Sequence, residues 1–218
     1  MTRWKERKHT KKYVEEYITP LEAEEIIKAC ERPRDKLILR TMWETAGRVS
    51  EVLNLTPEGI DKLNNCIYLT NLKQGRPDLK KVFLFPESTL CTDLLEYCKD
   101  NNIHATDWIF QGGVTVERLN KHIGQVSPTY IWYLISNPDS GRRMGLATAL
   151  GVRKIKDGKR KSAWPHLFRH GAAMNIYRRT GRLDVTQKEL GHSDIKTTEI
   201  YAKLMDSDVK NIIDKSTL

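Results

Sequence analysis

A histidine and a tyrosine near the C-terminus are the first residues of this sequence whose types and spacing could do chemistry together. Tyr201 follows His192 by nine residues in the segment LGHSDIKTTEIYAKL. A tyrosine hydroxyl has a pKa of about 10, so it becomes a nucleophile where neighbouring groups help to remove its proton. The alternative for Tyr201 taken alone is a half-buried packing residue whose hydroxyl stays in water. The other polar residues of the chain must decide between these interpretations.

His166 and Arg169 form a second candidate group, in the segment WPHLFRHGAAMNIYRRTG. They are three residues apart, so a helix places them on one face. His170, four residues after His166, has the spacing of half a helical zinc site. The glutamate of the H-E-x-x-H motif is absent, however, and the sequence offers no evident third ligand. We therefore expect no metal here.

Arg48 and Lys73 are the remaining candidates. Arg48 begins a short predicted helix in RVSEVLNL, three residues before Glu51. Taken alone, the two would form a surface ion pair worth about 0.3 kcal/mol. Lys73 lies in a polar connection that contains Gly75 and Pro77, where a lysine is usually an ordinary turn residue. Only the order of all these residues along the chain is informative.

The charge of the chain favours a polyanionic partner. The net charge is +9 and the sequence pI is about 9.3. Much of the positive charge lies in two segments, neither of which has the apolar face of a membrane-surface helix, so we expect nucleic acid and not a membrane. The residues predicted to contact DNA are Arg3, Lys5, Arg7, Lys8, Lys11 and Lys12 in the first segment and Arg153, Lys154, Lys159, Arg160 and Lys161 in the second.

The composition is that of a folded cytoplasmic protein. Hydrophobic residues make up 39% of the chain and charged residues 30%, and no stretch approaches the roughly 18 apolar residues of a membrane-spanning helix. The basic N-terminus lacks the apolar centre of a secretory signal. The four cysteines show no C-x-x-C spacing, which indicates reduced thiols and neither disulfides nor a zinc site.

The candidate residues must be positioned mainly by helices. Apolar spacing predicts helices from Pro20, with Thr19 as N-cap, and over 35–46, 48–55, 86–100, 129–136, 141–150, 164–180, 184–190 and 193–204. Residues 65–85 predict two strands of a β-hairpin. Residues 104–128 contain three glycines and predict loops with a short helix. The expected fold class is therefore mainly α with a small antiparallel β-sheet (α+β).

The order of the candidates resembles the catalytic core of the tyrosine recombinases, the phage-integrase and Xer-type family. The matching residues are Arg48, Lys73, His166, Arg169, His192 and Tyr201. The resemblance runs from about residue 19 to residue 204. It is most specific in PHLFRHGAAMNIY and LGHSDIKTTEIYAKL, and GRVSEVLNLTPEGID resembles the first-arginine box. Gly47 replaces a usual leucine and Gly171 a common threonine, and these packing positions concern stability more than chemistry.

The resemblance implies attack of the Tyr201 hydroxyl on a DNA phosphodiester, which gives a 3′-phosphotyrosyl link and a free 5′-hydroxyl. It implies that Arg48 and Arg169 clamp the non-bridging oxygens and that His192 adds a further donor. His166 would assist proton transfer at the tyrosine. No cofactor, metal ion or ATP is implied.

The resemblance also implies that a lysine on the hairpin acts as general acid and protonates the departing 5′ oxygen. Lys73 stands where the family carries this lysine. Lys80 and Lys81, farther along the hairpin, are the alternatives for that role.

The expected organisation is a basic N-terminal arm (1–18), a catalytic domain (19–205) and a C-terminal tail (206–218), which could pack on a neighbouring protomer. Family members usually carry an N-terminal core-binding domain, so the chain is either a short single-domain member or a fragment of a longer integrase. The expected partner is double-stranded DNA, bound by a tetrameric synaptic complex of copies that are monomers or weak oligomers when free. The expected location is the cytoplasm, with the nucleoid, and the source could be a virus or mobile element.

Two other functions remain open from the sequence. A type IB topoisomerase uses a similar tyrosine to relax supercoils without strand exchange, although the short interval between His192 and Tyr201 favours a recombinase. A non-catalytic DNA-binding regulator would use the same cations only to grip phosphate. The target sequence, the direction of the reaction and the choice between cis and trans cleavage stay open.

We predict that removal of residues 1–12 weakens binding to target and scrambled duplexes by similar factors, because the arm contacts phosphates and not bases. It should also flatten the slope of log K against log salt, to which each neutralised phosphate contributes about 0.9. Affinities for both duplexes across a salt series measure this effect, and the cleavage rate of the bound complex serves as the unchanged control. Tight binding that is insensitive to salt and to loss of the arm would contradict the prediction.

Overall fold

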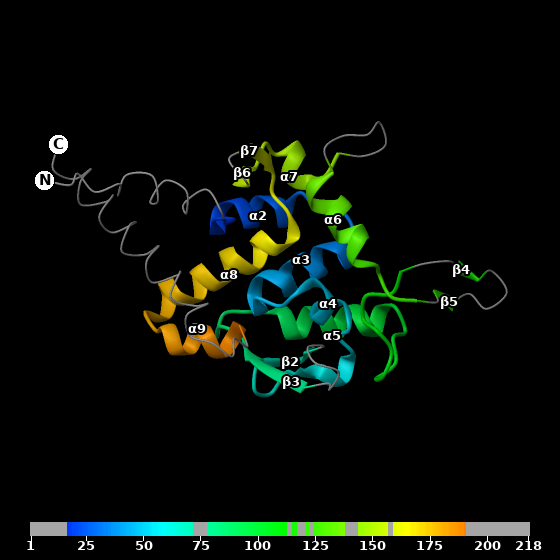
Figure 1. Ribbon diagram of the computed structural model, residues 1–218. Helices are drawn as coiled ribbons and strands as arrows, with labels where there is room; N and C mark the ends of the chain where they lie inside the picture. The colour runs from blue at the N-terminus through cyan, green and yellow to red at the C-terminus, as the bar shows by residue number, and fades with distance from the viewer. Residues whose placement is uncertain are drawn as a thin grey trace, which may run out of the picture.

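The computed structural model describes residues 17–71, 78–112, 115–116, 121–122, 124–137, 144–156 and 159–190. Most of these residues form helices, and the rest include short antiparallel strands (Figure 1). The helices are α2 (Pro20–Lys28), α3 (Pro33–Thr45), α4 (Val49–Leu53), η1 (Pro57–Gly59), α5 (Leu90–Asp100), α6 (Pro128–Ser136), α7 (Leu146–Ala149), α8 (Pro165–Thr180) and α9 (Leu183–Leu190). The strands are β1 (Ile60–Asp61), β2 (Cys66–Asn71), β3 (Asp78–Phe83), β4 (Thr115–Val116), β5 (Lys121–His122), β6 (Arg153–Lys156) and β7 (Lys159–Ser162). The predicted fold class is confirmed.

Helix α8 organises the helical part of the molecule. It packs against α2, α3 and α6, and Figure 1 shows it between α2 on one side and α3 on the other. Phe168 of α8 is fully buried and meets the ring of Trp43 edge-on, with centroids 6.3 Å apart. Among the described helices, none is both long and apolar enough to cross a membrane.

The helix ends follow the local sequence signals. Thr19 caps α2 in a reciprocal pair with Glu22, and Pro20 takes the first helical position, as predicted. Ser127 caps α6 through a single hydrogen bond, which its hydroxyl accepts from the backbone N–H of Tyr130. Gly181 ends α8 in the left-handed conformation, with φ of 64°. Of these signals, Gly181 marks the end of the helix that carries both His166 and Arg169.

The predicted hairpin is confirmed as β2 and β3, which pair antiparallel from Cys66 opposite Phe83 to Asn71 opposite Asp78. The short strand β1 adds a third strand on the other side of β2. Helix α9 packs on β3. The sheet and the end of α8 are therefore linked through α9, which lies beside both in Figure 1.

Three regions differ from the prediction. Within 104–128, the described residues before α6 form turns and an antiparallel ladder in place of a short helix. In this ladder the Gly112 N–H bonds the Gly124 carbonyl at 3.0 Å and β4 pairs with β5. Gly124 has φ of 112°, a conformation that suits glycine alone. The second basic segment forms the hairpin β6–β7, which period analysis missed. Helix α7 covers only the last part of the predicted 141–150 helix.

Gly47 and Gly171, the two departures from the family pattern, are required by close packing. A Cβ atom at Gly47 would lie 2.8 Å from Val52 Cγ2, and one at Gly171 would lie 2.1 Å from the Ile18 carbonyl oxygen. Ile18 and Tyr17 are themselves buried. The folded core therefore includes Tyr17 and Ile18, which we had predicted to belong to the basic N-terminal arm (1–18).

We predict that Gly171→Ala lowers the free energy of unfolding by about 2 kcal/mol, because the new methyl group must push α8 away from the Ile18 backbone. Urea denaturation measures the change. Helix propensity alone would give the opposite sign, since alanine is favoured over glycine inside a helix by up to about 1 kcal/mol. A Gly171→Ala variant more stable than the wild type would therefore contradict the close approach of α8 to the Ile18 backbone.

Candidate active site

Glu51, in the short helix α4, is a buried carboxylate surrounded by positive charge. It is 2% exposed, and its Oε2 accepts a hydrogen bond of 2.9 Å from the backbone N–H of Arg48. Its Oε1 accepts a second hydrogen bond from Arg48 Nη1, and Arg169 Nη1 lies 3.8 Å from Oε2. Burial opposes ionisation, but the Arg48 N–H, the charge of Lys80 and the Arg48 guanidinium outweigh it and hold the pKa of Glu51 below its usual value. The pair with Arg48 is thus largely internal and not a surface ion pair.

Arg169, in α8, hydrogen-bonds to two segments of this site that come from different parts of the chain. Its Nη1 donates to the Ala46 carbonyl and its Nη2 to the Leu190 carbonyl, each at 2.6 Å. One guanidinium therefore joins the turn before α4 to the end of α9. The side chain of Arg169 is 4% exposed and that of Arg48 is 28% exposed. Arg48 is consequently the arginine that solvent, or a phosphate, reaches more readily.

His166 stands at the surface in the first turn of α8. Partial burial of the imidazole and the charges of Arg169 and Arg48 lower its pKa below the ordinary value. The ring is therefore mostly uncharged at neutral pH and can accept a proton. It meets the ring of His170 edge-on, with centroids 4.5 Å apart. Within the described ranges, no group of three or more His, Cys, Asp or Glu side chains is placed to hold a metal ion.

Lys80 and Lys81, the neighbouring lysines of β3, have different surroundings. Lys80 is partly buried, and its Nζ donates to the Glu189 carbonyl at 2.7 Å. Lys81 lies over the rings of Tyr68 and Phe83, at 5.5 and 4.7 Å from their centroids. Only Lys80 interacts with the charges of Glu51 and the arginines. The alternating period of β3 indicates only that Lys80 shares a face with the buried Val82, and not which charges it meets there.

The structure brings together Arg48, His166 and Arg169 of the predicted catalytic residues. Lys73, His192 and Tyr201 lie outside the described residues. Lys73 belongs to the connection between β2 and β3, and His192 follows Leu190, the last residue of α9, by two positions.

The predicted DNA contacts are only partly described. The six residues of the N-terminal arm lie outside the described residues. Arg153, Lys159, Arg160 and Lys161 lie on the hairpin β6–β7. Lys154 is 6% exposed, and its Nζ binds both carboxylate oxygens of Glu22 at 2.6 and 2.7 Å. The ammonium of Lys154 is therefore occupied inside the protein, where it links the hairpin to α2.

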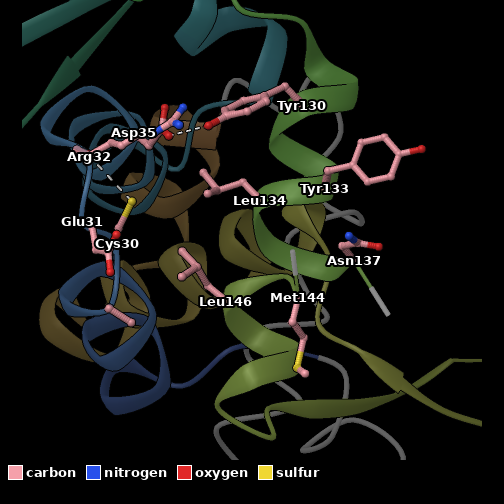
Figure 2. A pocket seen from close by; sticks show the side chains of 11 residues that line it. Cys30, Glu31, Arg32, Asp35, Tyr130, Tyr133, Leu134, Asn137, Met144 and Leu146 are labelled. Carbon is pink, nitrogen blue, oxygen red and sulfur yellow. Dashed lines mark hydrogen bonds between the residues drawn. The ribbon is translucent and has the colours of Figure 1, made fainter. Parts of the chain in front are cut away.

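A separate hollow of about 860 Å³ lies between the end of α2 and start of α3 on one side and helices α6 and α7 on the other (Figure 2). Asp35 and Tyr130 face one another across it through a hydrogen bond of 2.5 Å. Cys30 also lines it, and burial raises the pKa of that thiol to about 11. A thiol that stays protonated at neutral pH is a poor nucleophile. The hollow contains none of the predicted catalytic residues.

We predict that Glu51→Gln lowers the free energy of unfolding by about 3 kcal/mol, because removal of one buried charge leaves its partners uncompensated. The pKa of Glu51 is lower in the folded than in the unfolded state. Its contribution is therefore present above about pH 4.3 and is lost as the pH falls through the folded value.

The two proteins should accordingly converge in stability in acid, as chemical denaturation at a series of pH values can show. The matched control is Glu24→Gln, which removes an exposed pair with Lys28 and should leave the stability almost unchanged. Equal effects of the two substitutions on the free energy of unfolding would contradict the prediction that Glu51 compensates buried positive charge.

Solved structures share this fold. The crystal structure of XerA recombinase superposes with a TM-score of 0.66 at 23% identity, covering 92% of this chain and 64% of that one. A post-cleavage complex of the XerH site-specific recombinase with palindromic difH substrate gives 0.65 at 18% identity, covering 90% and 52%. The catalytic domain of bacteriophage HP1 integrase gives 0.55 at 19% identity, covering 89% and 93%. Identities this low establish the fold alone.

Sequence relatives point in the same direction. Tyrosine recombinase XerA of Saccharolobus solfataricus is 29% identical over 191 residues, which are 88% of this chain and 53% of the relative. Transposase A of transposon Tn554 from Staphylococcus aureus is 28% identical over 200 residues, which are 89% and 50%. The chain thus spans about half the length of these relatives. The family model described as Phage integrase family matches residues 16–208, nearly the whole chain, and the chain belongs to the phage integrase family.

Proposed function

We propose that this chain is the catalytic domain of a tyrosine-type site-specific DNA recombinase. In the proposed reaction Tyr201 attacks a DNA phosphodiester, the 5′ oxygen leaves, and a 3′-phosphotyrosyl link preserves the bond energy until a 5′-hydroxyl reverses the step. The observation that carries the proposal is the convergence of Arg48, Arg169 and His166 on one site, organised by the buried Glu51.

Charge stabilisation is the main contribution of the described residues. In phosphoryl transfer, negative charge develops on the non-bridging oxygens of the transition state. Arginine matches such oxygens with paired, directional N–H donors. Glu51 holds the Arg48 guanidinium and lies beside that of Arg169, so little reorganisation is needed when the phosphate arrives. The more exposed Arg48 would meet the phosphate first, with Arg169 beneath it.

Proton transfer completes the proposed mechanism. The lowered pKa of His166 leaves an uncharged imidazole at neutral pH, the form that can accept the Tyr201 proton. Lys73, on the connection between β2 and β3, would donate a proton to the departing 5′ oxygen. His192 would add a donor to the phosphate. The protein's own cations thus perform the charge neutralisation that metal ions provide in many phosphoryl-transfer enzymes, and no ATP is consumed.

Relatives support double-stranded DNA as the partner. XerH was solved with its difH substrate in pre-cleavage and post-cleavage complexes, and the Tn1549 transposon integrase with circular intermediate DNA. The net charge of +9 suits such a partner. We further propose that four copies assemble on paired sites in the cytoplasm, with the nucleoid. The likeness to Transposase A of Tn554 favours a mobile element as the setting.

Covalent capture tests the proposal. A DNA duplex with a nick beside the cleavage site loses a short fragment on cleavage, so religation fails and a protein–DNA adduct accumulates. We expect the wild-type chain to form this adduct and Tyr201→Phe to form none while it binds the same DNA. The matched control is Tyr177→Phe, at a partly buried tyrosine of α8, which should form the adduct normally.

The outcome can fail in two informative ways. Adduct formation by Tyr201→Phe would show that another residue is the nucleophile. DNA binding by the wild type without any adduct, on duplexes that carry the element's own end sequences, would favour a non-catalytic regulator.

A further inference from the structure

The end of α9 is held by two cations from different elements. Arg169 of α8 donates to the Leu190 carbonyl at 2.6 Å, and Lys80 of β3 donates to the Glu189 carbonyl at 2.7 Å. The last carbonyls of a helix have no partner within the helix, and cations near them also interact favourably with the helix dipole. Two successive carbonyls are thus bound immediately before the segment that contains His192.

Lys80 occupies a site in which burial and charge oppose one another. Burial lowers the pKa of its ammonium to about 8, and the charges of Arg169 and Arg48 act in the same direction. The carboxylates of Glu51 and Glu189 act in the opposite direction. These four groups face Lys80 from α8, from α4 with its N-cap, and from α9. Lys80 therefore interacts mainly with groups inside the protein and not with solvent.

Glu189 strengthens the link between α9 and β3. It is 8% exposed, and burial raises the pKa of its carboxyl, although Lys80, Lys188 and a hydrogen bond from the Phe83 backbone N–H favour the ionised form. Its Oε2 is buried without a hydrogen-bond partner among the described residues. The backbone and side chain of Glu189 are therefore both directed at β3, one toward Lys80 and the other toward Phe83.

We propose that Lys80 is a positioning residue that holds the end of α9 against β3, and thereby fixes the Leu190 carbonyl to which the Arg169 guanidinium of the phosphate site is bonded. The proposal rests on the proposed function, since it concerns the same reaction. It gives Lys80 a part different from that of Lys73, because Lys80 acts through the α9 backbone and donates no proton to the leaving oxygen.

Loss of the Lys80 proton should have opposite effects on the cleavage rate and on the stability of the protein. Its pKa is lower in the folded than in the unfolded state, so loss of the proton above about pH 8 favours the folded protein. A charged donor, however, makes the stronger hydrogen bond to a carbonyl. Cleavage should therefore slow above pH 8 while the contribution of this group to stability rises, and bound DNA should move the change to higher pH.

The experiment measures adduct formation from preformed complexes with the nicked duplex, together with DNA affinity. We expect Lys80→Met to slow adduct formation roughly 10- to 100-fold, as expected for a displaced catalytic group, with affinity changed less than about threefold. Lys80→Arg should restore most of the rate and keep it at alkaline pH, because arginine stays charged. The matched control is Lys81→Met, on the opposite face of β3, which should behave as wild type.

A substrate with sulfur in place of the 5′-bridging oxygen distinguishes positioning from proton donation, because the sulfur leaves without a proton. It should restore the rate of Lys73→Ala but not that of Lys80→Met. Rescue of Lys80→Met, or a wild-type rate for it on ordinary DNA, would overturn the proposal. Should Lys80→Met fail to fold, identical alkaline profiles of wild type and Lys80→Arg would overturn it.

Hydrogen exchange tests the hold on α9 without any cleavage. At one fixed pH, Lys80→Met should exchange the amides of residues 183–190 faster than Lys81→Met. If no variant and no wild-type sample forms an adduct, the proposed function fails by itself. Unchanged exchange in Lys80→Met would instead show that Lys80 does not position α9.

Discussion

A carboxylate removed from water must be compensated by nearby charges and hydrogen bonds, and the site of this protein is arranged around that requirement at Glu51. Because α4 is short, it cannot provide enough compensation by itself. The N-cap Arg48 contributes its backbone and its guanidinium, while Arg169 comes from α8 and Lys80 from β3. Segments far apart in the sequence are thereby held at one point.

The charges of this cluster do not cancel. Arg48, Lys80 and Arg169 carry three positive charges, whereas Glu51 and Glu189, when ionised, carry two negative ones. The excess of one positive charge suits a phosphodiester, which carries one negative charge. Burial is the main cause of the lowered pKa of Lys80, and the positive charges of Arg169 and Arg48 lower it further. An anion that enters the site would relieve this repulsion.

Local signals made much of the fold predictable. Thr19 with Pro20 marked one helix start, Gly181 marked the end of α8, and the change to a period of two marked β2 and β3. The hairpin β6–β7 was missed because its residues are nearly all charged, so no apolar alternation was present to indicate strands.

The site was predictable only through its order along the chain. His166 and Arg169 lie on one helix, but nothing local shows that Glu51 is buried or that Lys80 joins it. Both facts depend on contacts between residues more than 25 positions apart in the sequence, and the periodicity of one segment carries no information about such contacts. The parts assigned to Lys73, His192 and Tyr201 remain predictions, because these residues lie outside the described ranges.

The absence of a side chain at Gly171 has a mechanical consequence. It lets α8 touch the backbone of Ile18. About two turns farther along the same helix, Arg178 Nη2 donates a hydrogen bond of 3.0 Å to the Tyr17 hydroxyl. Tyr17 and Ile18 are therefore fixed directly to the helix that bears His166 and Arg169. A displacement of Tyr17 or Ile18 would consequently be transmitted to α8, and with it to the guanidinium and the imidazole that α8 carries.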